Sequence, residues 1–294
     1  MRDTKVTRAT RCKSWSEPMT RNDSDRLAVA LDAVRVSSLE TLRWFQNKDL
    51  QTTEKSDRSP VTQADIAAEG ILRREILGRF PSDGFLGEET GTTAGSSGYE
   101  WIVDPIDGTK SFIRGVPLWA TLVGCRHAGH GLLGVIAIPA LDEMVYATVG
   151  GGAWHVHGTA APLAARVSDR RDLSAALACS SDFTSFARRP EALGGRVAGL
   201  ATRAALEEAC LLCRTWGDGY GYLLVATGRA DLMVDPLMNA WDAAAVETVI
   251  HEAGGRFSDW QGRERIDSGE GVATNGLIHE EALVILRHAH PDAA

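Results

Sequence analysis

Carboxylate side chains are concentrated in three short segments, each at the expected start or end of a secondary-structure element. The segments are Gly87-Glu88-Glu89, Asp104-Pro105-Ile106-Asp107-Gly108-Thr109 and Trp241-Asp242-Ala243-Ala244. Hard divalent cations prefer oxygen ligands, and Mg²⁺ is held by a few carboxylates together with water and phosphate oxygens. Two such ions about 3.5–4 Å apart can stabilise both the attacking and the leaving oxygen of a phosphoryl transfer. The three segments together therefore indicate a metal site that acts on a phosphate.

Each segment also has an ordinary structural explanation. A single Asp-Pro or Asp-Gly pair is usually only a turn. Asp242 in the first turn of a predicted helix would complement the helix dipole without any ligand. Glu88 and Glu89 taken alone would suit a solvated loop. From these residues alone, a metal site and a set of unrelated turns and caps are both open interpretations.

The elements before these segments are predicted from hydrophobic periodicity and from capping residues. A first helix is expected over 22–45, followed by a polar loop over 47–60. A second helix is expected to begin at Thr62, with Asp65 as its capping-box partner, and to end at 81–84. This arrangement would place Asp65 at the start of a helix.

Beyond the second helix, short apolar runs predict strands. The first run, 101–103, stops abruptly at Asp104, which places that carboxylate at the end of a strand. Further strands are predicted over 119–125, 135–138, 144–149, 153–156, 176–179 and 230–234. Two later helices are predicted over 219–227 and 241–253, each closed by glycine. Asp242 would then lie in the first turn of the second of these helices.

Composition and charge narrow the class of protein. The chain has 294 residues, enough for one large layered domain or two small ones, and its 44% hydrophobic and 24% charged residues are typical of a globular protein. No apolar run approaches the length of about 18 residues that predicts a membrane span. The net charge of −8 argues against a nucleic-acid partner. A phosphorylated small molecule is not excluded, because local charge and bound metal decide its binding.

Cysteine usage and the N-terminal segment indicate a cytoplasmic protein. The five cysteines are odd in number and no secretory signal precedes them, so reduced thiols are expected. Cys210 and Cys213 form a single C-x-x-C that lacks the second pair of a zinc finger. Residues 1–23 are basic and aperiodic, and they are expected to be a disordered tail. Within this tail, Met19 is an alternative start to Met1.

The segments together resemble the motifs of the inositol monophosphatase family. The run 101–109 is similar to the first signature of that family, and Trp241-Asp242-Ala243-Ala244 followed by 252–255 is similar to the second. The runs 61–65 and 87–89 match its two upstream motifs, in the same order. The resemblance covers residues 25–290 and implies an α/β (α+β) fold, a five-layer αβαβα sandwich of the inositol monophosphatase and fructose-1,6-bisphosphatase type.

The resemblance also implies how the chain is divided and what each matching position does. An N-terminal α+β half, 24–165, would carry most metal ligands, and a C-terminal α/β half, 166–290, would supply the substrate pocket of one integrated phosphatase. The implied ligands of two or three Mg²⁺ ions, with Mn²⁺ as an alternative, are Glu88, Asp104, the carbonyl of Ile106, Asp107 and Asp242. Glu88 and Thr109 would orient and activate the attacking water, with Asp65 in support of Thr109 or of a metal-bound water.

Six positions bear on the substrate. The N–H groups of Gly108 and Thr109 would bind phosphate, and Lys110 after them resembles the histidinol-phosphate phosphatase branch of the family. The substrate-pocket positions that the resemblance implies in the C-terminal half are Arg214, Asp218 and Asp235. Extra carboxylates suit a cationic alcohol such as histidinol better than a neutral polyol. Alternatively, Asp218 caps the helix that follows it and Lys110 is a surface lysine.

The expected activity is a Mg²⁺-dependent phosphomonoesterase in histidine biosynthesis, which converts L-histidinol phosphate and water to L-histidinol and phosphate. The alternatives within the family are an inositol-1-phosphatase, another sugar-phosphate phosphatase and a nucleotide 3′-phosphatase. A non-catalytic member that binds a partner would have a broken metal set, whereas every ligand position is filled here. A small phosphorylated metabolite is therefore the expected partner, with no nucleic acid and no membrane, in a homodimer by analogy.

Overall fold

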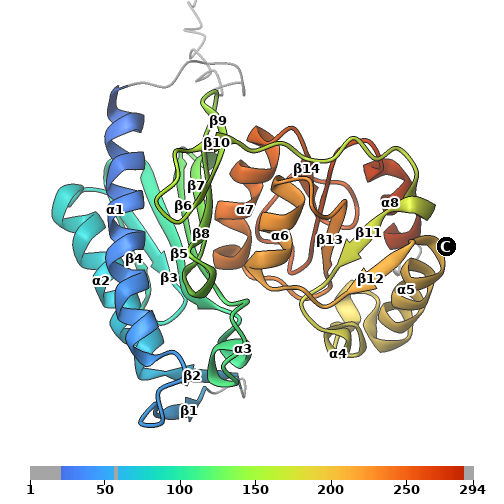
Figure 1. Cartoon of the computed structure of the whole chain (residues 1–294), viewed down its shortest axis with the longest axis horizontal. Coiled ribbons are helices and arrows are strands. Elements are labelled where there is room, and N and C mark those ends of the chain that lie inside the picture. The colour runs from blue at the N-terminus through green and yellow to red at the C-terminus, as the bar shows by residue number, and fades with distance from the viewer. Residues whose placement is uncertain (1–20, 56–58, 288–294) are drawn as a thin grey trace, which may run out of the picture.

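The computed structural model describes residues 21–55 and 59–287 as two halves that lie side by side, each built on its own sheet (Figure 1). The predicted tail over 1–23 extends too far at its C-terminal end, because helix α1 begins at Arg21. Met1 and Met19 lie outside the described residues. Within the described chain, no helix is both long and apolar enough to cross a membrane.

The N-terminal half consists of two long helices on one face of an eight-stranded sheet. Helices α1 (Arg21–Trp44) and α2 (Gln63–Arg79) pack against each other and against the sheet. Its strands, in spatial order, are β10 (Leu163–Ala164), β9 (Gly152–His157), β8 (Glu143–Thr148), β7 (His130–Ile138), β6 (Ala120–His127), β5 (Tyr99–Asp107), β3 (Gly84–Gly87) and β4 (Gly91–Thr93). Apolar side chains from both layers, such as Leu72 and Trp101, form the core between them.

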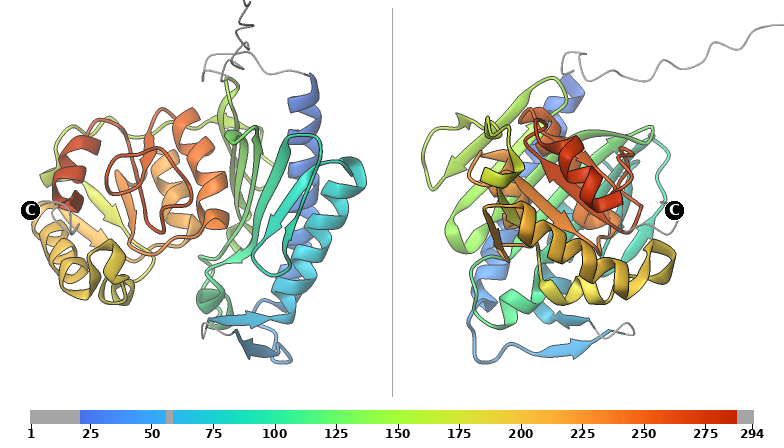
Figure 2. Two further views of the ribbon diagram at one scale, coloured as in Figure 1. Left: turned by 180° about the vertical axis from the view of Figure 1, so that it is seen from behind. Right: turned by 90° about the vertical axis from the view of Figure 1, so that its right-hand side faces the viewer.

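The C-terminal half contains a five-stranded sheet with helices on both faces. The strands, in spatial order, are β12 (Leu212–Arg214), β11 (Leu177–Cys179), β13 (Leu232–Asp235), β15 (Gly271–Thr274) and β14 (Arg256–Ser258). Helices α6 (Gly219–Ala226) and α7 (Ala240–Glu252) lie between the two sheets, as Figure 1 and the left view of Figure 2 show. The outer elements are α4 (Phe183–Ala187), α5 (Gly195–Ala209) and α8 (His279–Arg287).

The order of layers is helices, sheet, helices, sheet, helices, so the predicted five-layer αβαβα sandwich is confirmed. Helix α7 is buried on nearly all sides because it contacts the large sheet as well as α6. Its backbone comes so close to β7 that a Cβ atom built on Gly134 would lie 2.2 Å from the carbonyl oxygen of Ala245. Glycine at this position therefore lets the middle layer pack directly on the large sheet.

Helices α5 and α8 were not predicted from the sequence, and several short elements also differ from the predictions. The polar segment 47–60 was expected to be a loop, but it contains the hairpin of β1 (Thr52–Glu54) and β2 (Pro60–Thr62). Strand β5 continues past Val103 to Asp107, with an irregular register between Asp104 and Asp107. The remaining short elements are α3 (Thr109–Ile113), η1 (Pro139–Leu141), η2 (Leu173–Ala175) and η3 (Glu191–Leu193).

Candidate active site

Three of the predicted metal-ligating carboxylates meet where β5 ends against the start of α7. The irregular register of β5 carries Asp104 and Asp107, and Asp104 Oδ1 accepts a hydrogen bond of 3.0 Å from Ile106 N. Asp242 lies in the first turn of α7 and its Oδ2 accepts from Asn239 N at 2.6 Å. Carboxylate oxygens of Asp104, Asp107 and Asp242 all lie within 4.8 Å of one another. The cluster is therefore assembled from both halves of the molecule.

This cluster is electrostatically unfavourable without a cation. Burial, followed by the charges of neighbouring carboxylates such as Glu88, raises the pKa of Asp104 well above its ordinary value. Burial, followed by the charge of Asp218, also raises the pKa of Asp107 well above its ordinary value. Burial raises the pKa of Asp242 to about 7. Like charges that share a site disfavour ionisation unless a positive charge compensates them. Because every donor is a carboxylate oxygen, the site fits a hard divalent cation such as Mg²⁺ or Mn²⁺.

Glu88 follows β3 directly and lies near enough to the cluster for its charge to raise the pKa of Asp104. Its backbone N–H donates to Val103 O at 3.3 Å, which ties it to the neighbouring strand β5. Lys55 Nζ lies 2.7 Å from Glu88 Oε1 and 2.7 Å from Glu89 Oε1. The β1–β2 hairpin thus brings a cation to the predicted ligand Glu88. The sequence analysis did not identify Lys55, because a lysine in a polar segment gives no sign of its distant partners.

Thr109 and Asp65 are brought together although 44 residues separate them. Thr109 Oγ1 lies 3.3 Å from Asp65 Oδ1 and 3.2 Å from Ile106 O. Asp65 is buried, and its other oxygen, Oδ2, accepts from Thr62 N at 2.8 Å in the capping box of α2. Burial raises the pKa of Asp65 to about 6, against the hydrogen bonds from Thr62. A single carboxylate therefore both caps α2 and fixes the hydroxyl of Thr109.

Gly108 and Gly219 allow the two halves to approach closely at the site. Gly108 has φ +88°, and a Cβ atom there would lie 2.3 Å from Asp218 Oδ2. Asp218 stands at the N-cap position of α6, but its side chain makes no capping hydrogen bond. Gly219 N instead donates to Asp107 Oδ2 at 2.5 Å. Of the two interpretations of Asp218, the structure thus disfavours the helix cap.

A cavity of about 190 Å³ adjoins the cluster and has both Asp107 and Asp242 in its wall. Lys110, Asp218 and Asp235, three positions that the resemblance predicted to bind substrate, also line this cavity. The cavity is therefore continuous with the carboxylate cluster and lies mainly against the C-terminal half.

Asp235 is held rigidly in the wall of this cavity. Its Oδ1 accepts from Ser181 N at 3.1 Å and its Oδ2 accepts from Tyr222 Oη at 2.8 Å. Burial raises the pKa of Asp235 to about 6. Ser181 and Tyr222, together with Asp182, line the same cavity and were not identified from the sequence. No motif pointed to them, since their roles depend on contacts between separate elements.

Arg214, in contrast, does not line this cavity. It is exposed at the end of β12, where its Nη1 donates to Cys213 O at 2.8 Å. It lines a smaller, mostly apolar cavity together with residues such as Ser180 and Phe183. The cysteines among the described residues are free thiols, as expected, and Cys12 lies outside the described residues.

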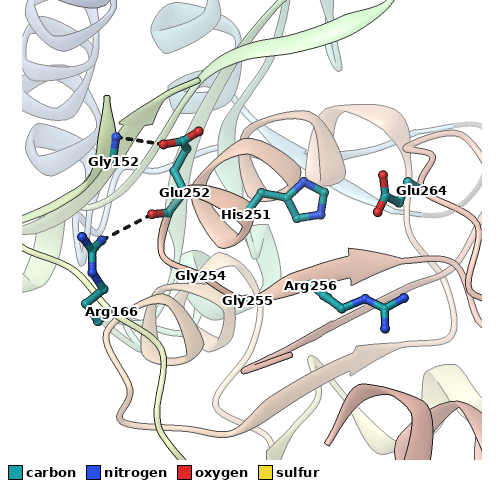
Figure 3. A pocket seen from close by; sticks show the side chains of 8 residues that line it. All are labelled: Gly152, Arg166, His251, Glu252, Gly254, Gly255, Arg256 and Glu264. Carbon is teal, nitrogen blue, oxygen red and sulfur yellow. Dashed lines mark hydrogen bonds between the residues drawn. The ribbon is translucent and has the colours of Figure 1, made fainter. Parts of the chain in front are cut away.

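A larger cavity of about 590 Å³ lies elsewhere, at the C-terminal end of α7 (Figure 3). None of the predicted metal ligands lines this cavity, and the carboxylate of Glu252 in its wall already accepts hydrogen bonds from backbone N–H groups. Glu252 Oε1 accepts from Gly150 N and Oε2 accepts from Gly152 N, both at 2.8 Å, and Arg166 Nη1 lies 3.5 Å from Glu252 O. These contacts bind the end of α7 to the β8–β9 turn, so we assign this region to the joint between the halves.

The comparisons with known proteins agree with this geometry. Residues 22–291 match the Inositol monophosphatase family. The chain is 39% identical to the histidinol-phosphatase of Mycobacterium tuberculosis over 90% of this chain and 98% of that protein, and 37% identical to the histidinol-phosphatase of Chlorobaculum parvum over the same shares. The solved structure of the extragenic suppressor protein SuhB from Bartonella henselae superposes with a TM-score of 0.79 at 29% identity, covering 89% of this chain and 98% of that one. With its carboxylate cluster, its layered fold and these relatives, the chain belongs to the inositol monophosphatase family.

Proposed function

We propose that this chain is a histidinol-phosphatase, a phosphoric monoester hydrolase that converts L-histidinol phosphate and water to L-histidinol and phosphate in histidine biosynthesis. The relatives at 37–39% identity carry this name. The observation that carries the proposal in the structure is the cavity beside the carboxylate cluster, whose walls hold Asp182, Asp218 and Asp235 in addition to the cluster itself. An acidic cavity suits an alcohol that bears an ammonium group and an imidazole.

We propose Mg²⁺ as the metal, with Mn²⁺ as an alternative, in two or three sites. The proposed ligands are Glu88, Asp104, the carbonyl oxygen of Ile106, Asp107 and Asp242. When bound there, the metal would neutralise the phosphate, lower the pKa of water and stabilise developing charge. The close approach of three carboxylates and the raised pKa of Asp242 support this assignment.

The residues around the cluster have complementary roles in the proposed reaction. Thr109 Oγ1, held by Asp65, orients the attacking water. Glu88 accepts a proton from that water, and the ammonium group of Lys55, 2.7 Å from Glu88 Oε1, holds the glutamate side chain in position. The N–H groups of Gly108 and Thr109 bind the phosphate. Water attacks in line with the departing alcohol, without a covalent phospho-enzyme.

Substrate preference tests this proposal most directly. Phosphate release is measured from histidinol phosphate, inositol 1-phosphate, fructose 1,6-bisphosphate and adenosine 3′,5′-bisphosphate, with and without Mg²⁺. We expect histidinol phosphate to exceed the others in kcat/KM by tenfold or more, which is about 1.4 kcal/mol of transition-state preference. A preference for inositol 1-phosphate would contradict the proposed substrate but keep the metal chemistry. Equal rates without metal would contradict both.

We further propose that the enzyme acts as a cytoplasmic homodimer in which each protomer, with N-terminal half 24–165 and C-terminal half 166–290, is one integrated phosphatase unit. The sharing of the carboxylate cluster between β5 and α7 supports the integrated unit. Analogy with the family supports the dimer. Light scattering coupled to gel filtration should give twice the 31.6 kDa mass of the chain; a mass of one chain would contradict the dimer.

A further inference from the structure

We propose that Asp182 binds the cationic part of the substrate alcohol and thereby makes the site selective for aminoalcohol phosphates over neutral polyol phosphates. This inference rests on the proposed phosphatase function of the same site. Asp182 lies in the wall of the cavity that adjoins the carboxylate cluster, and no motif of the sequence indicated it.

The position of Asp182 is fixed by local hydrogen bonds. It is the N-cap residue of α4, where its Oδ1 accepts from Ser185 N at 2.7 Å and from Thr184 Oγ1 at 2.5 Å. A carboxylate whose one oxygen is held in this way loses little further freedom when it binds a ligand. Asp182 is therefore a preorganised acceptor rather than a mobile surface side chain.

The second oxygen of Asp182 is available to a ligand. Among residues 21–55 and 59–287, Oδ2 has an ion pair with Lys110 Nζ at 4.0 Å, which is too long for a hydrogen bond. The side chain of Lys110 is 68% exposed, whereas Asp182 is 40% exposed. Lys110 can thus turn toward a bound phosphate, because it follows Thr109 directly, while Asp182 stays in place. The two residues come from α3 and α4, which face each other across the site (Figure 1).

The other two cavity carboxylates are less suited to this task. Both oxygens of Asp235 already accept hydrogen bonds from Ser181 N and Tyr222 Oη. Asp218 is hydrogen-bonded to the side chain of Ser181, and burial raises its pKa. For Asp182, burial also acts to raise the pKa, but the hydrogen bonds from Thr184 and Ser185 and the charge of Lys110 outweigh it, so its pKa lies below the ordinary value. Asp182 is thus an ionised carboxylate with an oxygen left for a cation.

The test is Asp182→Asn, which keeps an N-cap acceptor for α4 and removes only the charge. We expect KM for histidinol phosphate to rise about 10- to 100-fold with kcat little changed, because the lost contact is made equally in ground and transition states. For the neutral substrate inositol 1-phosphate, kcat/KM should stay within about threefold. The matched control is Asp172→Asn, since Asp172 caps η2 in the same manner but is exposed and does not line the cavity. It should leave both substrates unchanged.

A second measurement separates this inference from the proposed substrate. Binding of phosphate-free L-histidinol to the wild type and to D182N is measured by calorimetry, and rates are compared for phosphoethanolamine, which is cationic, and glycerol 1-phosphate, which is neutral. A wild type that ignores histidinol phosphate would contradict the proposed substrate, yet D182N should still lower the rate for phosphoethanolamine selectively. An equal loss for cationic and neutral esters, or unchanged affinity for histidinol, would overturn the role of Asp182.

Discussion

Gly219 N donates a hydrogen bond of 2.5 Å to Asp107 Oδ2, so the first residue of α6 in the C-terminal half orients a carboxylate of the N-terminal half. A Cβ atom on Gly219 would lie 2.7 Å from Ala120 Cβ and 3.0 Å from Asp107 Oδ2. The cluster is therefore complete only when α6 packs directly against β6. Packing of the two halves and catalysis are thus linked at one glycine.

Substitution Gly219→Ala should test this link. Overpacking against Ala120 is expected to cost about 1–3 kcal/mol of unfolding free energy. The displaced Asp107 should lower kcat/KM by at least about tenfold, because small misplacements of catalytic groups are costly. Urea unfolding and phosphate release measure the two effects. The control is Gly70→Ala in α2, where nothing lies within 4 Å of the new methyl group, so activity should be unchanged. Full activity in G219A would show that the α6 contact is dispensable.

Substitution Asp107→Asn should abolish activity without destabilising the metal-free protein. Burial and the charges of Asp218 and Asp242 raise the pKa of Asp107, so removal of its charge relieves repulsion, while the amide oxygen can still accept from Gly219 N. In the wild type, Mg²⁺ at about 100 times its dissociation constant should add about 2.7 kcal/mol of stability. Thermal unfolding with and without Mg²⁺ should show this gain in the wild type and in the exposed-site control Asp49→Asn, but not in D107N. A gain of equal size in D107N would argue against Asp107 as a ligand.

Glu252 is expected to stabilise the joint between the halves rather than take part in the reaction. Substitution Glu252→Ala removes the acceptor of the Gly150 and Gly152 N–H groups, of which the Gly152 contact is drawn in Figure 3. Because water can reach the exposed Gly150, we expect a loss of about 0.5–1.5 kcal/mol of unfolding free energy. Glu252→Gln retains one acceptor oxygen and should lose less. The control Glu75→Ala removes an exposed pair with Arg74 and should change stability by less than about 0.5 kcal/mol. Chemical denaturation measures these differences; equal stability of E252A and the wild type would contradict the assignment.

The layered fold was predicted from the resemblance of the motifs to those of the inositol monophosphatase family, whereas local signals in the sequence predicted only individual helices and strands. The capping box of Thr62 and Asp65 sets the start of α2, and the apolar run before Asp104 sets the strand that carries the cluster. The short strands β14 and β15 were missed, although β11 and β13, which are no longer than these, were predicted, because three or four residues show no reliable periodicity of their own. Their pairing depends on neighbours that are distant in sequence.

Only some of the site residues were predicted, because contacts between distant parts of the chain leave no local signal in the sequence. Predicted positions such as Asp104, Asp107 and Asp242 come together in space. Lys55 and Asp182 could not be identified from the sequence, because only tertiary contacts bring them to the site. Lys55 contacts Glu88, which is distant in sequence, and Asp182 lines a cavity formed by several separate elements. Arg214 was placed in the substrate pocket but does not line the cavity, although it is only four residues from Asp218 in the sequence.

His279 should make stability depend on pH in a defined window. It is fully buried, with Nε2 3.1 Å from Ser258 Oγ and Nδ1 3.0 Å from Thr274 Oγ1. The hydroxyl of Ser258 donates to Asp259 O, so Ser258 Oγ accepts from Nε2–H, and Nδ1 accepts from Thr274. Burial lowers the pKa of His279 from 6.5 to about 4. A proton on Nδ1 would therefore break the contact with Thr274 inside the core.

The sign of the effect follows from this lowered pKa. Between pH 6.5 and about 4, His279 is protonated in the unfolded chain but neutral in the folded protein. The free energy of unfolding therefore decreases as pH falls through this range, and above pH 6.5 the effect vanishes. From pH 7.5 to 5.0 the wild type should lose about 2 kcal/mol more unfolding free energy than His279→Gln. The difference between the two proteins cancels the titration of His251, whose pKa burial also lowers. The exposed-site control His157→Gln should follow the wild type. Parallel pH profiles for H279Q and the wild type would mean that His279 is not neutral in the folded protein.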